Sequence, residues 1–199
     1  MDNRIKGGIM NILGIIGSRN PSGKTGSCVD CFLDTVRSKA HDVGKIFLTE
    51  KKIEKCKQCD INGWGKCRTD GFCVINDDFS EIVEYIRKSD GIVFATPVYF
   101  SDLSESMKTF LDRLRRISRN EKGRQGITEK PVIGICVAGG GGGGSVMCSF
   151  FLERTLLTCG FVVVDMIPVR RQNLSLKQEI LRITGNWFVQ HISGGAYKQ

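Results

Sequence analysis

Short apolar runs alternate with amphipathic helical patterns along the chain, and this alternation constrains the fold more than any other feature. Nearly continuous apolar runs are typical of strands that are buried on both faces of a parallel sheet. Helical patterns between such runs indicate repeated strand–helix–strand units. The predicted strands are residues 9–16, 92–95, 132–138 and 161–164, with a weaker fifth strand at 43–48.

The helices are predicted from apolar spacing and from start and stop signals. One helix follows the first strand. A second helix is predicted over 78–89, with Asp77 or Asp78 as its acidic cap, and apolar residues at helical spacing predict a third over 107–114. A fourth helix, Ser145–Cys159, is expected to end at Gly160. Ser175 and Gln178 form a capping box before the last helix.

Five strands alternating with five helices predict an α/β domain with a doubly wound parallel sheet and helices on both faces. In such sheets ligands bind beyond the carboxyl ends of the strands, where the strand order reverses. The loops after Ile16, Ala95 and Ala138 are therefore the places to look for a site. We expect one domain over residues 1–199, with flexible ends at 1–8 and 193–199.

Composition excludes several classes of protein. Hydrophobic residues make up 41% of the 199 residues and charged residues 25%, which is ordinary for a globular domain. No apolar run approaches the ~20 residues of a membrane span, and the polar first eight residues lack the apolar core of a signal peptide. We therefore expect a cytoplasmic protein without membrane contact.

The loop after the first strand has the composition of an anion site. It contains small and hydroxyl residues, the cations Arg19 and Lys24, and the start of a helix. The alternative is a merely polar turn. The sequence argues against a nucleotide triphosphatase, because Gly17 and Gly23 are separated by five residues rather than four, and the third strand ends Phe94-Ala95-Thr96 without an acidic residue.

Two further loops complete a pattern. Thr96-Pro97-Val98-Tyr99-Phe100 precedes the segment 106–113, and a run of six glycines, Gly139–Gly144, follows the fourth strand. Glycines allow close approach of backbone to a flat ligand. The alternatives are that Tyr99 and Phe100 are core aromatics and that the glycine run is a linker.

With Gly17-Ser18 and Thr25, these segments resemble the flavodoxin-like NAD(P)H-dependent FMN reductases. The resemblance implies a three-layer fold with strand order 2-1-3-4-5 and a flavin-dependent oxidoreductase that binds FMN, with NAD(P)H as a possible electron donor. The cofactor then carries the chemistry, so we name no catalytic acid or base. The implied FMN-binding residues are Ser18, Arg19, Asn20, Ser22, Lys24, Thr25, Thr96, Pro97, Val98, Tyr99, Phe100, Ala138, Gly139, Gly140 and Gly141.

Four of the nine cysteines lie within 18 residues, in the order C-x2-C-x7-C-x5-C. Such a density of thiols indicates an iron–sulfur cluster or zinc, or else free redox-active thiols. The cysteine-rich segment, residues 54–77, is expected as an insertion between the second strand and the second helix. The candidate ligands are Cys56, Cys59, Cys67 and Cys73.

The position of this segment resembles the cluster motif of iron–sulfur flavoproteins, which implies a [4Fe–4S] cluster. Their pattern has two residues in the middle gap, whereas this chain has seven. We expect the extra loop around Trp64 to bulge out and still deliver Cys67. The remaining cysteines are expected in the core, and His41 and His191 lie far from the three loops.

The resulting hypothesis is a protein that passes electrons between an iron–sulfur cluster and FMN. One alternative is a cluster-free NAD(P)H-dependent FMN or quinone reductase. Another is a non-catalytic flavin-binding redox sensor or a zinc-stabilised binding module. The resemblance implies a homodimer or homotetramer. The net charge of +8, with a basic segment over 113–130, suits an acidic ferredoxin-type partner or the phosphates of a nicotinamide cofactor. No nucleic-acid recognition module is present in the sequence.

Overall fold

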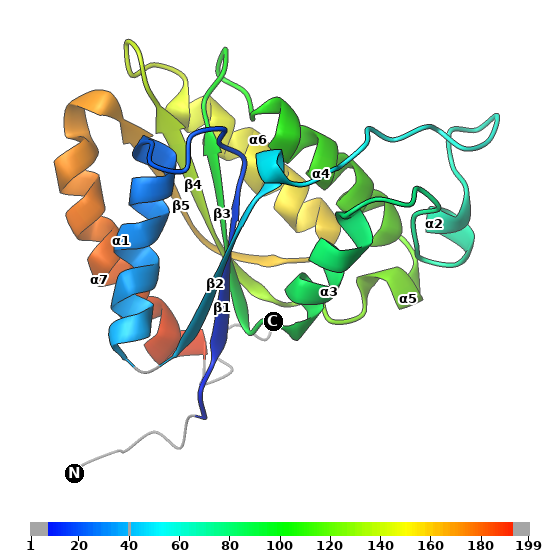
Figure 1. The fold of residues 1–199 in the computed structure, drawn as a ribbon, viewed down its shortest axis with the longest axis horizontal. Coiled ribbons are helices and arrows are strands. Elements are labelled where there is room, and N and C mark those ends of the chain that lie inside the picture. The colour runs from blue at the N-terminus through cyan, green and yellow to red at the C-terminus, as the bar shows by residue number, and fades with distance from the viewer. Residues whose placement is uncertain (1–7, 40, 193–199) are drawn as a thin grey trace.

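The computed structural model describes residues 8–39 and 41–192. They form a five-stranded parallel sheet in the order β2-β1-β3-β4-β5 (Figure 1). This confirms the predicted flavodoxin-like α/β fold. The strands are β1 (Asn11–Ile16), β2 (Asp42–Phe47), β3 (Gly91–Pro97), β4 (Pro131–Ala138) and β5 (Val162–Arg170).

Helices cover both faces of the sheet and make it the middle of three layers (Figure 1). On one face α1 and α7 pack against Ile12, Val93 and Ile135. On the other face α3, α4 and α6 pack against Ile15, Phe94 and neighbouring strand residues. The long helices are α1 (Lys24–Ser38), α3 (Phe79–Lys88), α4 (Glu105–Ile117), α6 (Ser145–Cys159) and α7 (Leu174–Ile192), and the short ones are η1 (Leu48–Glu50), α2 (Lys66–Thr69), α5 (Glu121–Arg124) and η2 (Arg171–Asn173).

Helix α6 has the bounds that the sequence predicts, and Gly160 ends it in the left-handed conformation at φ 95°. The predicted capping box is wrong, because α7 begins at Leu174 and so contains Ser175. Gln178 instead donates from its Nε2 to the Ser27 side chain of α1, at 2.6 Å. The ends predicted to be flexible, residues 1–8 and 193–199, lie outside the described residues except for Gly8.

The order of the strands fixes where a ligand can sit. From β1 the chain crosses to β2 on one side and later to β3 on the other, so the strand order reverses between β1 and β3. The loops that follow these two strands separate at their carboxyl ends and leave room for a ligand there.

The cysteine-rich segment leaves the sheet after η1 and returns at α3. In Figure 1 it extends beyond the side of the domain and carries α2, which packs against α4. The Asn120 side chain holds α2 in place, because its Nδ2 donates to the main-chain oxygens of Arg68 and Thr69, both at 3.0 Å. Within the described residues, no helix is long and apolar enough to cross a membrane.

We expect Phe110→Ala to lower the free energy of unfolding by about 3–5 kcal/mol, the usual result of emptying a buried aromatic site. Phe110 is fully buried in α4, and its ring lies 5.5 Å from that of Phe79. The matched control is Phe150→Ala, which removes a ring that is 49% exposed and should cost about 0.5 kcal/mol or less. Urea unfolding measures both, and equal losses would contradict the packing described.

Candidate functional site

A cleft of about 750 Å³ opens at the carboxyl ends of β1 and β3, within the range of about 300–1,000 Å³ that is usual for small-molecule sites. Its walls come from the loop after β1, the segment after β2 and the start of α4. The lining residues are Gly17, Arg19, Leu48, Thr49, Glu50, Lys51, Ile53, Tyr99, Ser104, Glu105, Ser106 and Thr109.

The loop between β1 and α1 is held by hydrogen bonds around Asn20. The Asn20 side chain accepts from the main-chain N–H of Ser22 at 3.1 Å, and the main-chain N–H of Gly23 donates to the Asn20 carbonyl at 3.0 Å. No side chain among the described residues caps the first turn of α1. Its N–H groups and the positive end of the helix dipole are therefore available to an anion.

The predicted phosphate-loop residues divide into two groups. Ser18 and Thr25 are buried and shape the loop, whereas Arg19 is exposed and lines the cleft. Asn20, Ser22 and Lys24 are exposed as well. Cations and free N–H groups at one helix N-terminus favour a phosphate group over the alternative of a merely polar turn.

The end of β3 is tied to α4 by hydroxyl groups. The fully buried Thr96 side chain donates to the Ser104 Oγ at 3.2 Å and accepts from the Ser104 main chain at 3.0 Å. Ser106 donates from its Oγ to the Gly17 carbonyl at 3.2 Å, which joins the loop after β1 to the same helix. Thr96 therefore positions the cleft, and its side chain faces the protein rather than a ligand.

Two main-chain N–H groups within residues 97–100 are bonded within the protein. The Val98 N–H donates to the Val137 carbonyl and the Tyr99 N–H to the Asp102 carbonyl, each at 3.0 Å. Pro97 has no N–H group. These residues supply a wall of the site, while the donors at Val98 and Tyr99 are already used within the protein.

Residues 99–102 form a tight turn with two residues at positive φ, Phe100 at 49° and Ser101 at 66°. Glycine or asparagine normally fills such positions, and bulky residues there store strain of about 1–3 kcal/mol each. The turn leaves Tyr99 half-exposed on the cleft and Phe100 fully exposed. This exposure excludes the alternative that both are core aromatics.

The glycine run lies next to this turn. A Cβ at Gly144 would come within 2.6 Å of the Ser101 Oγ, so only glycine allows that approach. If a Cβ were added at Gly139, Gly140 or Gly141, no described atom would lie within 4 Å of it. Ala138, which precedes the glycine run, is buried.

Hydrogen bonds give this loop a defined shape. The Gly142 N–H donates to the Gly139 carbonyl at 2.9 Å, and the Gln172 Nε2 donates to the Gly141 carbonyl at 3.0 Å. A held loop with open space beside its backbone favours a ligand-binding role over a linker.

A second, smaller pocket is lined by all four clustered cysteines. Cys56, Cys67 and Cys73 are half-buried and Cys59 is exposed. Burial raises the pKa of Cys67, as do the nearby thiols of Cys56 and Cys73, while Arg116 lowers it. The seven-residue middle gap therefore still brings Cys67 to the other cysteines.

Among the described residues, no three His, Cys, Asp or Glu side chains lie close enough together to hold a single metal ion. A [4Fe–4S] cluster makes a different demand, because each of its four irons takes one cysteine. Four thiols spread around the wall of one pocket fit that ligand set better than they fit one tetrahedral zinc ion.

The loop that fills the middle gap is clamped by aromatic and cationic contacts. The guanidinium groups of Arg116 and Arg68 lie 4.9 Å and 5.4 Å from the ring centre of Trp64, a geometry that is stabilising. Arg116 also donates from its Nη1 to the Gly63 carbonyl at 2.6 Å. Ile61 at the tip is fully exposed, so the loop bulges outward as expected.

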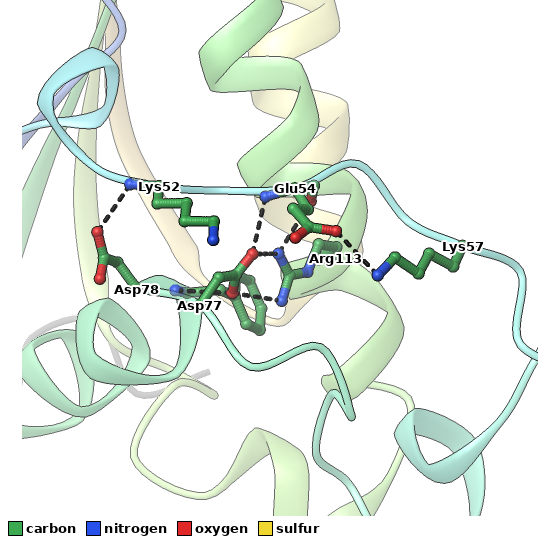
Figure 2. A network of polar contacts seen from close by, with 7 residues as sticks. Lys52, Glu54, Lys57, Asp77, Asp78 and Arg113 are labelled. Atoms are coloured by element: carbon green, nitrogen blue, oxygen red, sulfur yellow. Dashed lines mark hydrogen bonds and ion pairs between the residues drawn. The ribbon is translucent and has the colours of Figure 1, made fainter.

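A buried ion pair closes the two ends of the cysteine-rich segment (Figure 2). Arg113 of α4 donates from Nη1 and Nη2 to the two Asp77 oxygens at 2.6 Å and 2.9 Å, and from Nη1 to the Glu54 carbonyl at 2.9 Å. Asp77 also accepts from the main-chain N–H groups of Glu54 and Phe79. The exposed fractions of the two side chains are 1% and 0%, so both charges are removed from water and each is the other's charge partner.

The two pockets share structural elements. Thr109 of α4 lines the cleft and Arg113, one turn later, lines the cysteine pocket, a rise of about 6 Å along the helix. Ile53 lines the cleft and Cys56 the cysteine pocket, and three residues span at most about 11 Å. The pockets are neighbours.

The sequence motifs do not identify several of these residues. The segment after β2 carries no motif. Its only pattern is a pair of apolar residues, Leu48 and Ile53, at the two ends of the polar stretch 49–52. Asp77 is recognisable only as a candidate helix cap, and Arg113 only as part of a basic run. Because Arg113 is buried, it contributes nothing to a basic docking surface.

Four of the other five cysteines, Cys28, Cys136, Cys148 and Cys159, are buried in the core, and Cys31 is partly exposed. Burial raises the pKa of Cys28 and of Cys159 to about 12, so both remain thiols. A hydrogen bond with Cys136 raises the pKa of Cys148, and burial adds to the effect. This agrees with the expectation for the four buried positions.

Comparison with known proteins places the chain in a family. Residues 10–178 match the family described as NADPH-dependent FMN reductase. The chain therefore belongs to the NADPH-dependent FMN reductase family, and it is a flavin-dependent oxidoreductase with a flavodoxin-like fold.

Two relatives are iron–sulfur flavoproteins. One, from Methanocaldococcus jannaschii, is 30% identical over 152 residues, which is 76% of each chain. Another, from Archaeoglobus fulgidus, is 33% identical over 105 residues, or 53% of this chain and 46% of that protein. The match thus spans less than half the length of the Archaeoglobus relative.

Solved structures share the fold at low identity. An NAD(P)H:quinone oxidoreductase from Methanothermobacter marburgensis has a TM-score of 0.69 at 16% identity, covering 92% of this chain and 98% of that one. A flavodoxin from the domain Archaea has a TM-score of 0.56 at 14% identity, covering 92% and 100%.

We expect Asp77→Asn to lower the free energy of unfolding at pH 7 by about 3–5 kcal/mol, because it leaves the Arg113 charge buried and unpaired. The double variant Asp77→Asn/Arg113→Gln removes both charges and should lose roughly half as much. Urea unfolding of the two variants is the measurement. A double variant less stable than the single one would contradict the account.

The direction of the Asp77 pKa shift determines the pH range in which the stability contributed by its carboxylate can be measured. Burial alone would raise the pKa of Asp77, but hydrogen bonds from Arg113, Glu54 and Phe79 hold it below its usual value. The stability that the carboxylate contributes is therefore present above its unfolded-state pKa of about 3.9 and is lost as pH falls through the lower folded-state pKa.

Proposed function

We propose that this chain binds FMN in the cleft and a [4Fe–4S] cluster on the four clustered cysteines, and passes electrons between them to an acceptor. The observation that carries the proposal is the arrangement of the two pockets, which lie one helical turn apart on α4. Similarity to iron–sulfur flavoproteins supports it.

FMN is supported on two grounds: the open space beside Gly139–Gly141 and the uncapped N-terminus of α1. Neither group of residues lines the cleft itself, but Arg19 and Tyr99, which do, belong to the adjoining loops. The phosphate would be held at that helix by Arg19, Lys24 and the loop hydroxyl and amide groups. The ring would lie between residues 97–100 and 138–141. When bound, FMN supplies one- and two-electron transfer, and these residues bind it, orient it and exclude water.

The cysteine pocket fits a cluster because four thiols face one space next to the buried cation Arg113. Cys56, Cys59, Cys67 and Cys73 would each hold one iron. When bound, the cluster supplies transfer of single electrons. Arg116 and Trp64 fix the loop that brings Cys67 to the pocket.

The electron donor and the acceptor are proposed on separate grounds. NAD(P)H is the donor that the family name indicates. Arg68 and Arg116 flank Trp64 beside the cysteine pocket, and such a basic, aromatic rim would suit an acidic ferredoxin-type protein. We also propose a homodimer or homotetramer, by resemblance to the family.

We expect Gly139→Val to weaken FMN binding at least tenfold while changing the free energy of unfolding by about 0.5 kcal/mol or less. The valine fits the ligand-free loop, since no described atom lies within 4 Å of the Cβ position, but it occupies the proposed place of the flavin. The control is Gly143→Val, which is equally open and lies outside the proposed site. Fluorescence titration with FMN that finds equal affinities for the two variants would contradict the flavin position.

The proposed cluster is tested by iron and sulfide content and by the visible spectrum of protein prepared without oxygen. The wild type should contain about four irons and four sulfides per chain, and a Ser at any of the four clustered cysteines should abolish this content. Cys31→Ser, a partly exposed cysteine on α1, is the matched control. Flavin without iron would select the cluster-free reductase, and zinc in place of iron would select the zinc-stabilised module.

A further inference from the structure

One nitrogen of the Arg113 guanidinium makes no hydrogen bond within the described residues. Both of its Nη atoms bond Asp77, and Nη1 also bonds the Glu54 carbonyl. Its Nε is buried and has no hydrogen-bond partner among the described residues. A buried N–H group without a partner is destabilising, so its retention needs an explanation.

The cysteine pocket offers one. Arg113 and Cys73 both line it, so the guanidinium and the Cys73 thiol border the same space. The guanidinium also lies 4.2 Å from the ring centre of Phe79, which leaves it little freedom to move. Water is excluded because 1% of the side chain is exposed.

We propose that Arg113 is a positioning and charge-compensating residue for the group bound by the four cysteines, with its Nε–H donating to a sulfur at the Cys73 side of the pocket. This inference rests on the proposed function. A cluster that takes up one electron, from reduced flavin or an external reductant, gains one negative charge. The fixed cation stabilises that reduced form and raises the reduction potential.

Asp77 does not cancel this effect. It is bound on the Nη side of the guanidinium, whereas the proposed contact uses Nε. In a dry interior a nearby charge acts more strongly than a farther one. Lysine cannot replace arginine here, because its ammonium group lacks the planar fork that holds a carboxylate with two donors and presents a third.

The test is a one-electron redox titration of the cluster in the intact protein, followed by EPR, with the potential of the bound flavin in the same sample as an internal control. Asp77→Asn/Arg113→Gln keeps the net charge of the pair at zero and removes the cation. Arg113→Lys keeps the charge and removes the Nε donor. Arg115→Gln, on the same helix and 39% exposed, is the matched control.

We expect the double variant to lower the equilibrium constant for cluster reduction about tenfold, a shift of about 59 mV, and Arg113→Lys to lower it by a smaller factor. The Arg115→Gln variant and the flavin potential should match the wild type. A purely structural role for Arg113 would change the melting temperature or the iron content without moving the potential of assembled clusters.

Two results would overturn the inference: an unchanged cluster potential in both Arg113 variants, or loss of iron from both while flavin and melting temperature are retained, which would assign Arg113 to cluster assembly instead. A wild-type protein that holds no iron would overturn the proposed function itself. The two failures are therefore distinguishable.

Discussion

The buried pair of Arg113 and Asp77 is the constraint on which the cysteine-rich segment depends. A chain of more than 20 residues with one short helix cannot bury a core of its own. The pair ties both ends of this segment to α4, through the Glu54 carbonyl at one end and Asp77 at the other. With the ends fixed, the clamp on Trp64 is enough to hold the cysteines around one pocket.

This arrangement places two kinds of site on one helix. The first turns of α4 join the loops after β1 and β3 through Ser104 and Ser106, and its later turns carry Arg113 and Arg116. Any shift of α4 would therefore move the cleft and the cysteine pocket together. A rigid shared element would suit the proposed electron exchange between them, because it keeps the separation of the two sites constant.

The fold and the positions of the three loops were predictable because they depend on local patterns. Apolar runs in the sequence predict buried strands, and a glycine run or a glycine–serine turn predicts a loop. The Arg113–Asp77 pair was not predictable, since its members are 36 positions apart and each has an ordinary local role. The occupied N–H groups of Val98 and Tyr99 were missed for a similar reason, because their partners depend on how β4 and the strained turn are placed.

The central claim is that one chain holds two redox groups in adjacent pockets. An anaerobic reductive titration of the purified holoprotein, followed by visible absorption and EPR, counts the electrons taken up per chain. The account predicts about three electrons, two at the flavin and one at the cluster. An endpoint of about two electrons, all at the flavin, would contradict it.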